Sequence, residues 1–378
     1  MKKILSTLAL VPLFLVASFA VGYGIGTLLG GGSQESVDLL KLFKAVVLCA
    51  VALVVGFLVH TVLHEAGHLL GGLLTGYRFL SFRIFNLCLQ RDDSGLHWKY
   101  YDLGGTVGQC LMTPPQKTPM PYFWYNAGGV LVNLLICVLC ACLLACVDLS
   151  MFGFSFCVMS LIVGAWLFFL NAIPMTVGFP NDGKTILTLY RHPEQRRIFY
   201  AMLAVVTESA RGKRLSEMPS EWFVSAPLTG QSTIMDVSAR NLTYSWLMDN
   251  GQFDEAREMA DEFLSLGEKV VPRVFRMEVV CDRLLLELMT LRREEVIREL
   301  WSKEQQKYVQ AYKTSAPMKS ALLFAYELYV HKDKEAALKH LEEVKSRQNR
   351  YTQLGEVGSA LELMTAMLEK EAAEQTEV

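Results

Sequence analysis

The chain has 378 residues with a formal net charge of −2, and 52% of its residues are hydrophobic. The near-neutral charge, with no basic stripe, argues against a nucleic-acid partner, and the nine cysteines give no disulfide framework. Charge divides the chain near residue 183, because the first 183 residues hold 9 Lys+Arg and 8 Asp+Glu, whereas the remaining 195 hold 27 and 30. We therefore expect a membrane domain followed by a water-soluble one.

Four apolar segments are long enough to cross a bilayer, for which about 20 residues suffice. They run from about residue 4 to 29, 46 to 75, 123 to 147 and 154 to 173. The first is either a signal peptide cleaved after Ala20 or, as its length favours, an N-terminal membrane anchor over residues 1–30. Four cysteines in the third segment are expected to act as small packing residues: Cys137, Cys140, Cys142 and Cys146.

The second segment carries the sequence HEAGH at residues 64–68. Histidines four residues apart project from one helix face, so His64 and His68 can reach one metal ion. Glu65 is placed to take a proton from a water on that metal. A glutamate inside a span costs about 2.5–3.5 kcal/mol on insertion scales, which indicates a functional role. His60 is expected to pack behind the site, because a catalytic metal needs an open position.

The loop at 76–121 is expected to form a small β-hairpin, with extended residues at 78–90 and 96–101 around a polar turn. The glycine-rich stretch at 104–109 either returns beside the second span or is a surface linker. Cys110 beside it is the one thiol with a case for reactivity.

The positions of Lys and Arg predict the orientation of the membrane domain. Five lie in the loop at 76–121 and four more between residues 184 and 197, whereas the loop between the third and fourth segments has only Asp148. We therefore expect a multi-pass protein of the cell membrane with loop 76–121 and the C-terminal domain in the cytosol. The metal motif would then lie near the cytosolic end of its span.

Two histidines leave a catalytic zinc site one protein ligand short. Asp182 follows the fourth segment and a stretch rich in Pro, Asn and Gly that would interrupt the helix. On spacing alone, Asp182 is either the third ligand or the cap of the next helix.

Together these residues resemble the site-2 protease family of intramembrane zinc metalloproteases. HEAGH looks like the family's first motif, Gly129 to Asn133 like its GxxxN motif, and Asn171-Ala-Ile-Pro174 leading to Asp182 like its third. The resemblance covers about residues 45–185, in the family's order. It implies peptide-bond hydrolysis at membrane depth, with Zn2+ held by His64, His68 and Asp182 and with Glu65 as general base. The spacing from Pro174 to Asp182 is longer than is usual in the family.

The sequence allows two roles for each of two asparagines. Asn133 is either a substrate contact or a packing residue between helices, and Asn171 either donates to a developing oxyanion or caps the broken helix. A helical substrate must unwind before cleavage, and an edge of the hairpin could receive it as an added strand. The resemblance implies the same role for the β element.

The C-terminal half is rich in helix formers. Residues 250–256 resemble the turn of a tetratricopeptide repeat, and similar registers recur at 290–296 and 330–336. This spacing predicts stacked helix pairs that bind a cytosolic protein partner; the alternative is an irregular helical domain. The charged tail at 369–378 is expected to fray.

The expected fold is mainly α-helical: the anchor at 1–30, an intramembrane metalloprotease domain at 42–192 that contains loop 76–121, and a soluble helical-repeat domain at 200–368. Its substrate would be a membrane protein or peptide within the lipid bilayer. The alternative function is a non-catalytic membrane scaffold that acts through its C-terminal repeats, although the presence of Glu65 favours an enzyme. A peptidase of another HExxH lineage would use a glutamate as third ligand, which the few acids of the membrane domain disfavour.

Overall fold

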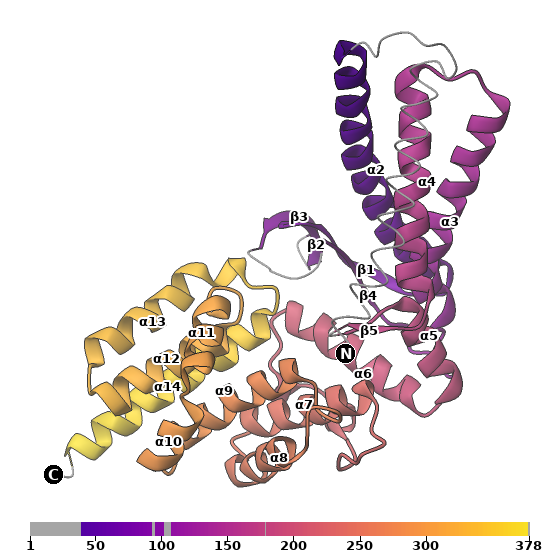
Figure 1. The fold of residues 1–378 in the computed structure, drawn as a ribbon. Coiled ribbons are helices and arrows are strands. Elements are labelled where there is room, and N and C mark those ends of the chain that lie inside the picture. Colours follow the sequence, from indigo (N-terminus) through magenta and orange to yellow (C-terminus); the bar gives the residue numbers. More distant parts are fainter. Residues whose placement is uncertain (1–38, 93–94, 102–106, 178, 377–378) are drawn as a thin grey trace. The chain divides into compact units, whose positions relative to one another are not determined.

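The computed structural model describes residues 39–92, 95–101, 107–177 and 179–376, so the predicted anchor at 1–30 lies outside the described residues. The described chain is mainly helical with a small antiparallel sheet (Figure 1). It forms two compact units. Of the described residues, one unit holds those from Leu39 to Gly76 and from Pro121 to Thr188, and the other holds those from Tyr77 to Met120 and from Leu189 to Thr376. The loop predicted within the metalloprotease domain therefore belongs, by its contacts, with the C-terminal half.

The first unit is a bundle of three long helices, α2 (Leu39–Leu74), α3 (Phe123–Cys146) and α4 (Met151–Ala172), each of which contacts the other two. All three are long and apolar enough to cross a membrane, as predicted for the second, third and fourth segments. Large apolar side chains remain exposed along them, including Val46, Val54, Leu70, Leu135, Leu139 and Phe169. Exposed apolar side chains are favourable on helices that are surrounded by lipid. A helix is also suited to that environment because its backbone polar groups form hydrogen bonds within the helix.

Glycines bring α2 and α3 into backbone contact. A Cβ on Gly67 would lie 2.3 Å from the carbonyl oxygen of Gly128, and a Cβ on Gly128 would lie 2.0 Å from that of Gly67. One turn further along α2, a Cβ on Gly71 would lie 2.0 Å from the carbonyl oxygen of Trp124. Only glycine fits at these positions, which is how small residues allow close helix packing in membranes.

The sheet of the second unit has four strands: β1 (Arg78–Ile84), β2 (Leu87–Asp92), β3 (Gly95–Tyr100) and β4 (Gly108–Thr113). All neighbours are antiparallel, in the order β3-β2-β1-β4. The sequence analysis predicted a hairpin of two extended runs, whereas the sheet has four strands. The run at 78–90 turns back at Phe85, whose φ of 51° is unusual for a bulky residue. Gly108 and Gln109, from the glycine-rich stretch with two open interpretations, begin β4.

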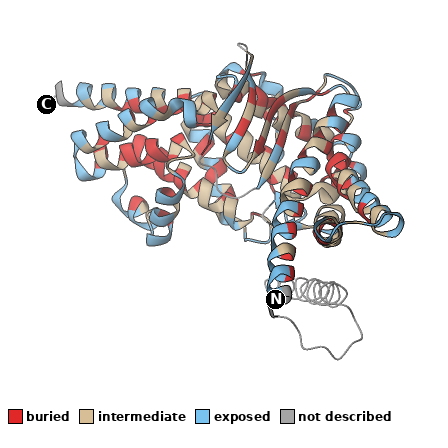
Figure 2. Ribbon diagram, turned by 90° about the horizontal axis from the view of Figure 1, so that it is seen from above, coloured by how far each residue is buried: buried red, intermediate tan, exposed pale blue. Residues whose placement is uncertain are grey.

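The chain continues into α5 (Asp182–Arg191) and then into the helices of the second unit. These are α6 (Gln195–Ala210), α7 (Ile234–Asp249), α8 (Phe253–Ser265), α9 (Arg273–Met289), α10 (Glu294–Leu300), α11 (Lys303–Tyr312), α12 (Pro317–Tyr326), α13 (Lys334–Arg347) and α14 (Leu354–Thr376). Buried and exposed residues alternate around these helices (Figure 2), and their buried apolar residues form cores between them.

Three helix pairs of this unit contain equivalent turns. Gly251 and Arg292 have φ of 71° and 52° and follow α7 and α9, the first helices of the pairs α7–α8 and α9–α10. In the pair α12–α13, a short π-helix (Glu327–His331) continues α12, and Lys332 follows it with a φ of 57°. The three residues fall within the three sequence registers. A short helix, α11, is inserted before the third pair.

The predicted frayed tail is helical as far as Thr376. Lys370 donates to the carbonyl oxygen of Met289 at 3.1 Å, and Arg292 forms an ion pair with Glu374 at 2.8 Å. These contacts hold the end of α14 in place. The charged composition of the tail gave no indication of them.

Candidate metal centre

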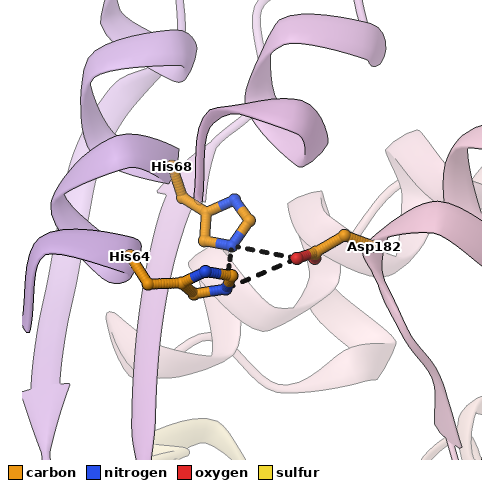
Figure 3. Close-up of side chains that lie close together, drawn as sticks. All are labelled: His64, His68 and Asp182. Atoms are coloured by element: carbon orange, nitrogen blue, oxygen red, sulfur yellow. Dashed lines mark hydrogen bonds and ion pairs between the residues drawn. The ribbon is translucent and has the colours of Figure 1, made fainter. Parts of the chain in front are cut away.

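Three predicted ligands converge within the first unit. His64 and His68 lie on one face of α2, and Asp182 is the first residue of α5 (Figure 3). The two Nε2 atoms lie 3.1 Å apart, and Oδ2 of Asp182 lies 3.4 Å from that of His64 and 3.5 Å from that of His68. Ligand atoms bound at 2.0–2.1 Å in a tetrahedron are about 3.3 Å apart. The observed spacing therefore fits three ligands of one metal ion.

Two of the three donor atoms also have the chemistry that a metal requires. Oδ2 of Asp182 is buried and has no hydrogen-bond partner among the described residues, which is costly unless a cation compensates it. His68 supplies a lone pair, because its Nδ1 lies 2.7 Å from the carbonyl oxygen of Tyr125. A carbonyl can only accept, so Nδ1 carries the proton and Nε2 is left to bind metal.

The residues between Pro174 and Asp182 fold back on themselves. Two short strands, β5 (Thr176–Val177) and β6 (Phe179–Pro180), pair with Thr176 opposite Pro180. The pairing of β5 with β6 accommodates the longer spacing between Pro174 and Asp182. The chain therefore begins α5 close to the end of α4. A Cβ on Gly183 would lie 2.1 Å from the carbonyl oxygen of Ala172, so glycine is required for this approach.

Asn181, which the sequence interpretation did not single out, is the cap at this junction. Its Oδ1 accepts from two backbone N–H groups and its Nδ2 donates to two backbone carbonyls, with partners Met175 at 3.1 Å, Lys184 at 2.9 Å, Leu170 at 2.5 Å and Ile173 at 2.7 Å. Because Asn181 fills the capping role, the Asp182 side chain is available to face the histidines. Its place in the first turn of α5 also favours a negative charge.

Asn133 holds two histidines of α2 from the neighbouring helix. Its Nδ2 lies 3.0 Å from Nδ1 of His64, and its Oδ1 lies 3.1 Å from Nδ1 of His60. His60 and Asn133 are both fully buried. Asn133 and His60 therefore lie behind the proposed ligand His64. The sequence analysis predicted this packing position for His60.

Glycines make room for these imidazoles. A Cβ on Gly129 of α3 would lie 2.6 Å from Nε2 of His68 and 2.7 Å from Nε2 of His64. A Cβ on Gly164 of α4 would lie 2.3 Å from Cε1 of His60. The ligands themselves therefore require a glycine at Gly129, the only glycine of the GxxxN motif.

Glu65 is the only acidic residue in the three helices that could span a membrane. It is 9% exposed and three residues before His68, which places both side chains on the same side of α2. Its carboxylate interacts electrostatically with His68. A buried carboxylate beside a ligand can accept a proton there.

Asn171 and Cys110 were also candidates from the sequence. Asn171 is in the last turn of α4, where its amide donates to the carbonyl oxygen of Leu167 at 3.0 Å. Cys110 is a buried residue of β4, 5% exposed. Neither belongs to the group of metal-ligating side chains found among the described residues.

Comparison of this chain with protein-family models, curated proteins and solved structures found no match. Function must therefore be argued from the site itself.

Proposed function

We propose that this chain is an intramembrane zinc metalloprotease. The observation that supports it best is the convergence of His64, His68 and Asp182, with Glu65 beside them, on helices that are apolar enough to span a membrane. Two histidines and one carboxylate are a ligand set of zinc peptidases and leave a position open for substrate. The resemblance to site-2 proteases in three ordered motifs points to the same function.

In this proposal each side chain has a defined task. Zinc, when bound, would polarise the scissile carbonyl and lower the pKa of an attacking water towards about 7. Glu65 takes the proton of that water and returns it to the leaving amine. The carbonyl of Tyr125 and the amide of Asn133 hold the rings of His68 and His64, because outer contacts fix ligand orientation.

The substrate class follows from where these residues lie. A peptide bond within a bilayer is in helical backbone, so the substrate must unwind before Glu65 can act on it. In the four-stranded sheet, β3 and β4 are the edge strands, and β4 contacts α6. An unwound peptide could therefore pair with β3 by strand addition.

The decisive experiment compares membrane proteomes of cells that express the wild type or Glu65→Gln. The variant keeps the three ligands but loses the base, so we expect full zinc content and accumulation of uncleaved substrate. Glu194→Gln is the matched control, because Glu194 is exposed and distant in sequence from the site. Identical proteomes for the wild type and Glu65→Gln would favour the alternative, a scaffold that acts through its C-terminal helices.

A further inference from the structure

The second compact unit contains a cluster of four ionisable side chains that the proposed protease chemistry does not use. Lys319 of α12 lies at its centre and is 2% exposed. Three carboxyl groups interact electrostatically with it, those of Glu278 and Asp282 on α9 and that of Glu356 on α14. Helices that are distant in the sequence therefore meet at one buried ammonium group, and three possible negative charges face a single positive one.

Glu278 makes the direct contact with the ammonium group. Nζ of Lys319 lies 2.5 Å from Oε2 of Glu278, and the hydroxyl of Tyr308 on α11 donates to Oε1 of the same carboxylate. The first contact is a charge-assisted hydrogen bond between fully opposite charges. Lys319 carries one positive charge, so an ionised Asp282 or Glu356 adds a negative charge that this pair does not balance.

The other titratable groups around the cluster do not supply the missing positive charge. Besides the four side chains, those that face it are Tyr244 of α7, Cys281 of α9, Tyr308 of α11 and Tyr351 just before α14. Burial raises the pKa of the thiol and of the three phenols, so all four are neutral near pH 7. On the surrounding helices, basic side chains pair with other acids, namely Arg283 with Asp261 and Glu287, Arg347 with Glu343, and Lys213 with Glu208.

Asp282 and Glu356 therefore bind protons more tightly than ordinary carboxyl groups. Burial raises the pKa of Asp282 from 3.8 to about 6, with Lys319 opposing the rise and Glu278 adding to it. Burial raises the pKa of Glu356 from 4.5 to about 7, against the same lysine and with help from Glu278 and Asp282. Both side chains are half-buried, so protons can exchange with the solvent.

The sign of the effect on stability follows from these directions. A carboxyl group whose pKa is raised in the folded state stabilises the fold below its unfolded-state pKa. That stability is lost as the pH rises through the folded-state pKa. For Asp282 and Glu356 the loss falls between about pH 4 and pH 7, as their pKa values of about 6 and about 7 require.

From this arrangement we infer that the cluster is a pH-sensitive switch, which holds α14 at mildly acidic pH and loosens it as the pH rises. With Asp282 and Glu356 protonated, one ammonium group faces one carboxylate and the charges balance. When both release their protons to the solvent, three carboxylates share one ammonium group and repel each other. Because α14 contacts α6, α12 and α13, its loosening affects the packing of much of the helical part. This inference does not depend on proteolysis.

The test measures hydrogen exchange of the full chain in detergent by mass spectrometry, in peptides from α14, at pH 5 and at pH 8. Each variant is compared with the wild type at the same pH, so the intrinsic pH dependence of exchange cancels. Glu356→Gln keeps the shape of the side chain and an oxygen that can accept from the backbone N–H of Met318, but it cannot ionise. We expect it to exchange like the wild type at pH 5 and about tenfold or more slowly at pH 8, because one pKa unit is a tenfold change in the equilibrium.

Two further variants complete the test. Asp282→Asn should change exchange in the same direction, and it decides the question if Glu356→Gln does not fold. Glu369→Gln is the matched control, because Glu369 is exposed on the same helix, and it should exchange like the wild type at both pH values. A ratio of variant to wild-type exchange rates that is equal at pH 5 and pH 8, for both Glu356→Gln and Asp282→Asn, would overturn the inference. So would faster exchange of both variants at pH 8.

Discussion

The amide of Asn133 bridges His64, a proposed ligand, and the buried His60. A residue in this position controls the ring orientation of the ligand without touching the metal. Removal of such outer partners typically weakens metal affinity about 10–100-fold. Asn133 is therefore better understood as a positioning residue for His64 than as a direct substrate contact.

We expect Asn133→Leu to lower zinc affinity by about 10–100-fold, measured by competition with a chelator in detergent. Asn126→Leu is the matched control on the same helix, because the amide of Asn126 donates to the carbonyl oxygen of Tyr122, the N-cap residue of α3, and not to a histidine. If both variants bind zinc as tightly as the wild type, Asn133 does not position the ligand.

The ligands themselves should show a sharper effect. His64→Ala, His68→Ala and Asp182→Ala should each lose stoichiometric zinc, because a two-ligand site binds weakly. His192→Ala, which removes an exposed histidine, should retain it. Zinc content is measured by atomic emission on purified protein, and full retention by Asp182→Ala would remove Asp182 from the site.

At the scale of elements, much of this fold could be predicted from the sequence. Three spans and the pairing of His64 with His68 follow from apolar length and helical spacing. The turn at Phe85 could not be predicted, because it lacks the glycine or Asn-Gly signal of a tight hairpin. The capping role of Asn181 could not be predicted either, because Asn and Asp are equally good caps. Only the fold shows that Asn181, and not Asp182, faces the backbone.

The packing of α2 on α3 yields a prediction about helix geometry. Gly128→Ala would place a Cβ 2.0 Å from the carbonyl oxygen of Gly67, so the helices must separate and the ligands on α2 lose their fixed surroundings. We expect lower zinc affinity and a lower Tm. Gly153→Ala is the control, because its nearest neighbour atom would lie at an ordinary 3.5 Å. Equal Tm and zinc affinity for Gly128→Ala and the wild type would contradict this packing.

Glu287 of α9 links stability to pH. Hydrogen bonds from Arg293, together with Arg283, hold its pKa at about 2, below the usual 4.5. A lowered pKa gives stability that is present above pH 4.5 and is lost as the pH falls towards 2. Glu287→Gln should thus lower the free energy of unfolding of the second compact unit at pH 7. The difference from the wild type in this free energy should shrink below pH 4.5. A difference that is independent of pH would show that the ion pairs contribute nothing.

At the scale of the whole molecule, the distribution of Lys and Arg predicts the orientation in the membrane. In a cysteine-free background, single cysteines in loop 76–121 and after residue 189 should be protected from an impermeant reagent in intact cells. A cysteine at Asp148 should react. The reverse pattern would place the metal ligands near the outer face.

The two compact units should also be separable. The apolar cores of the C-terminal helices are formed by residues between 205 and 367. Residues 189–376 expressed alone should therefore be soluble, helical and cooperatively folded by circular dichroism. In turn, removal of residues after Arg191 should leave zinc binding intact, because all three ligands, Tyr125 and Asn133 belong to the other unit. Loss of zinc from that truncated protein would show that the metal centre depends on the helical unit and that the two halves fold as one.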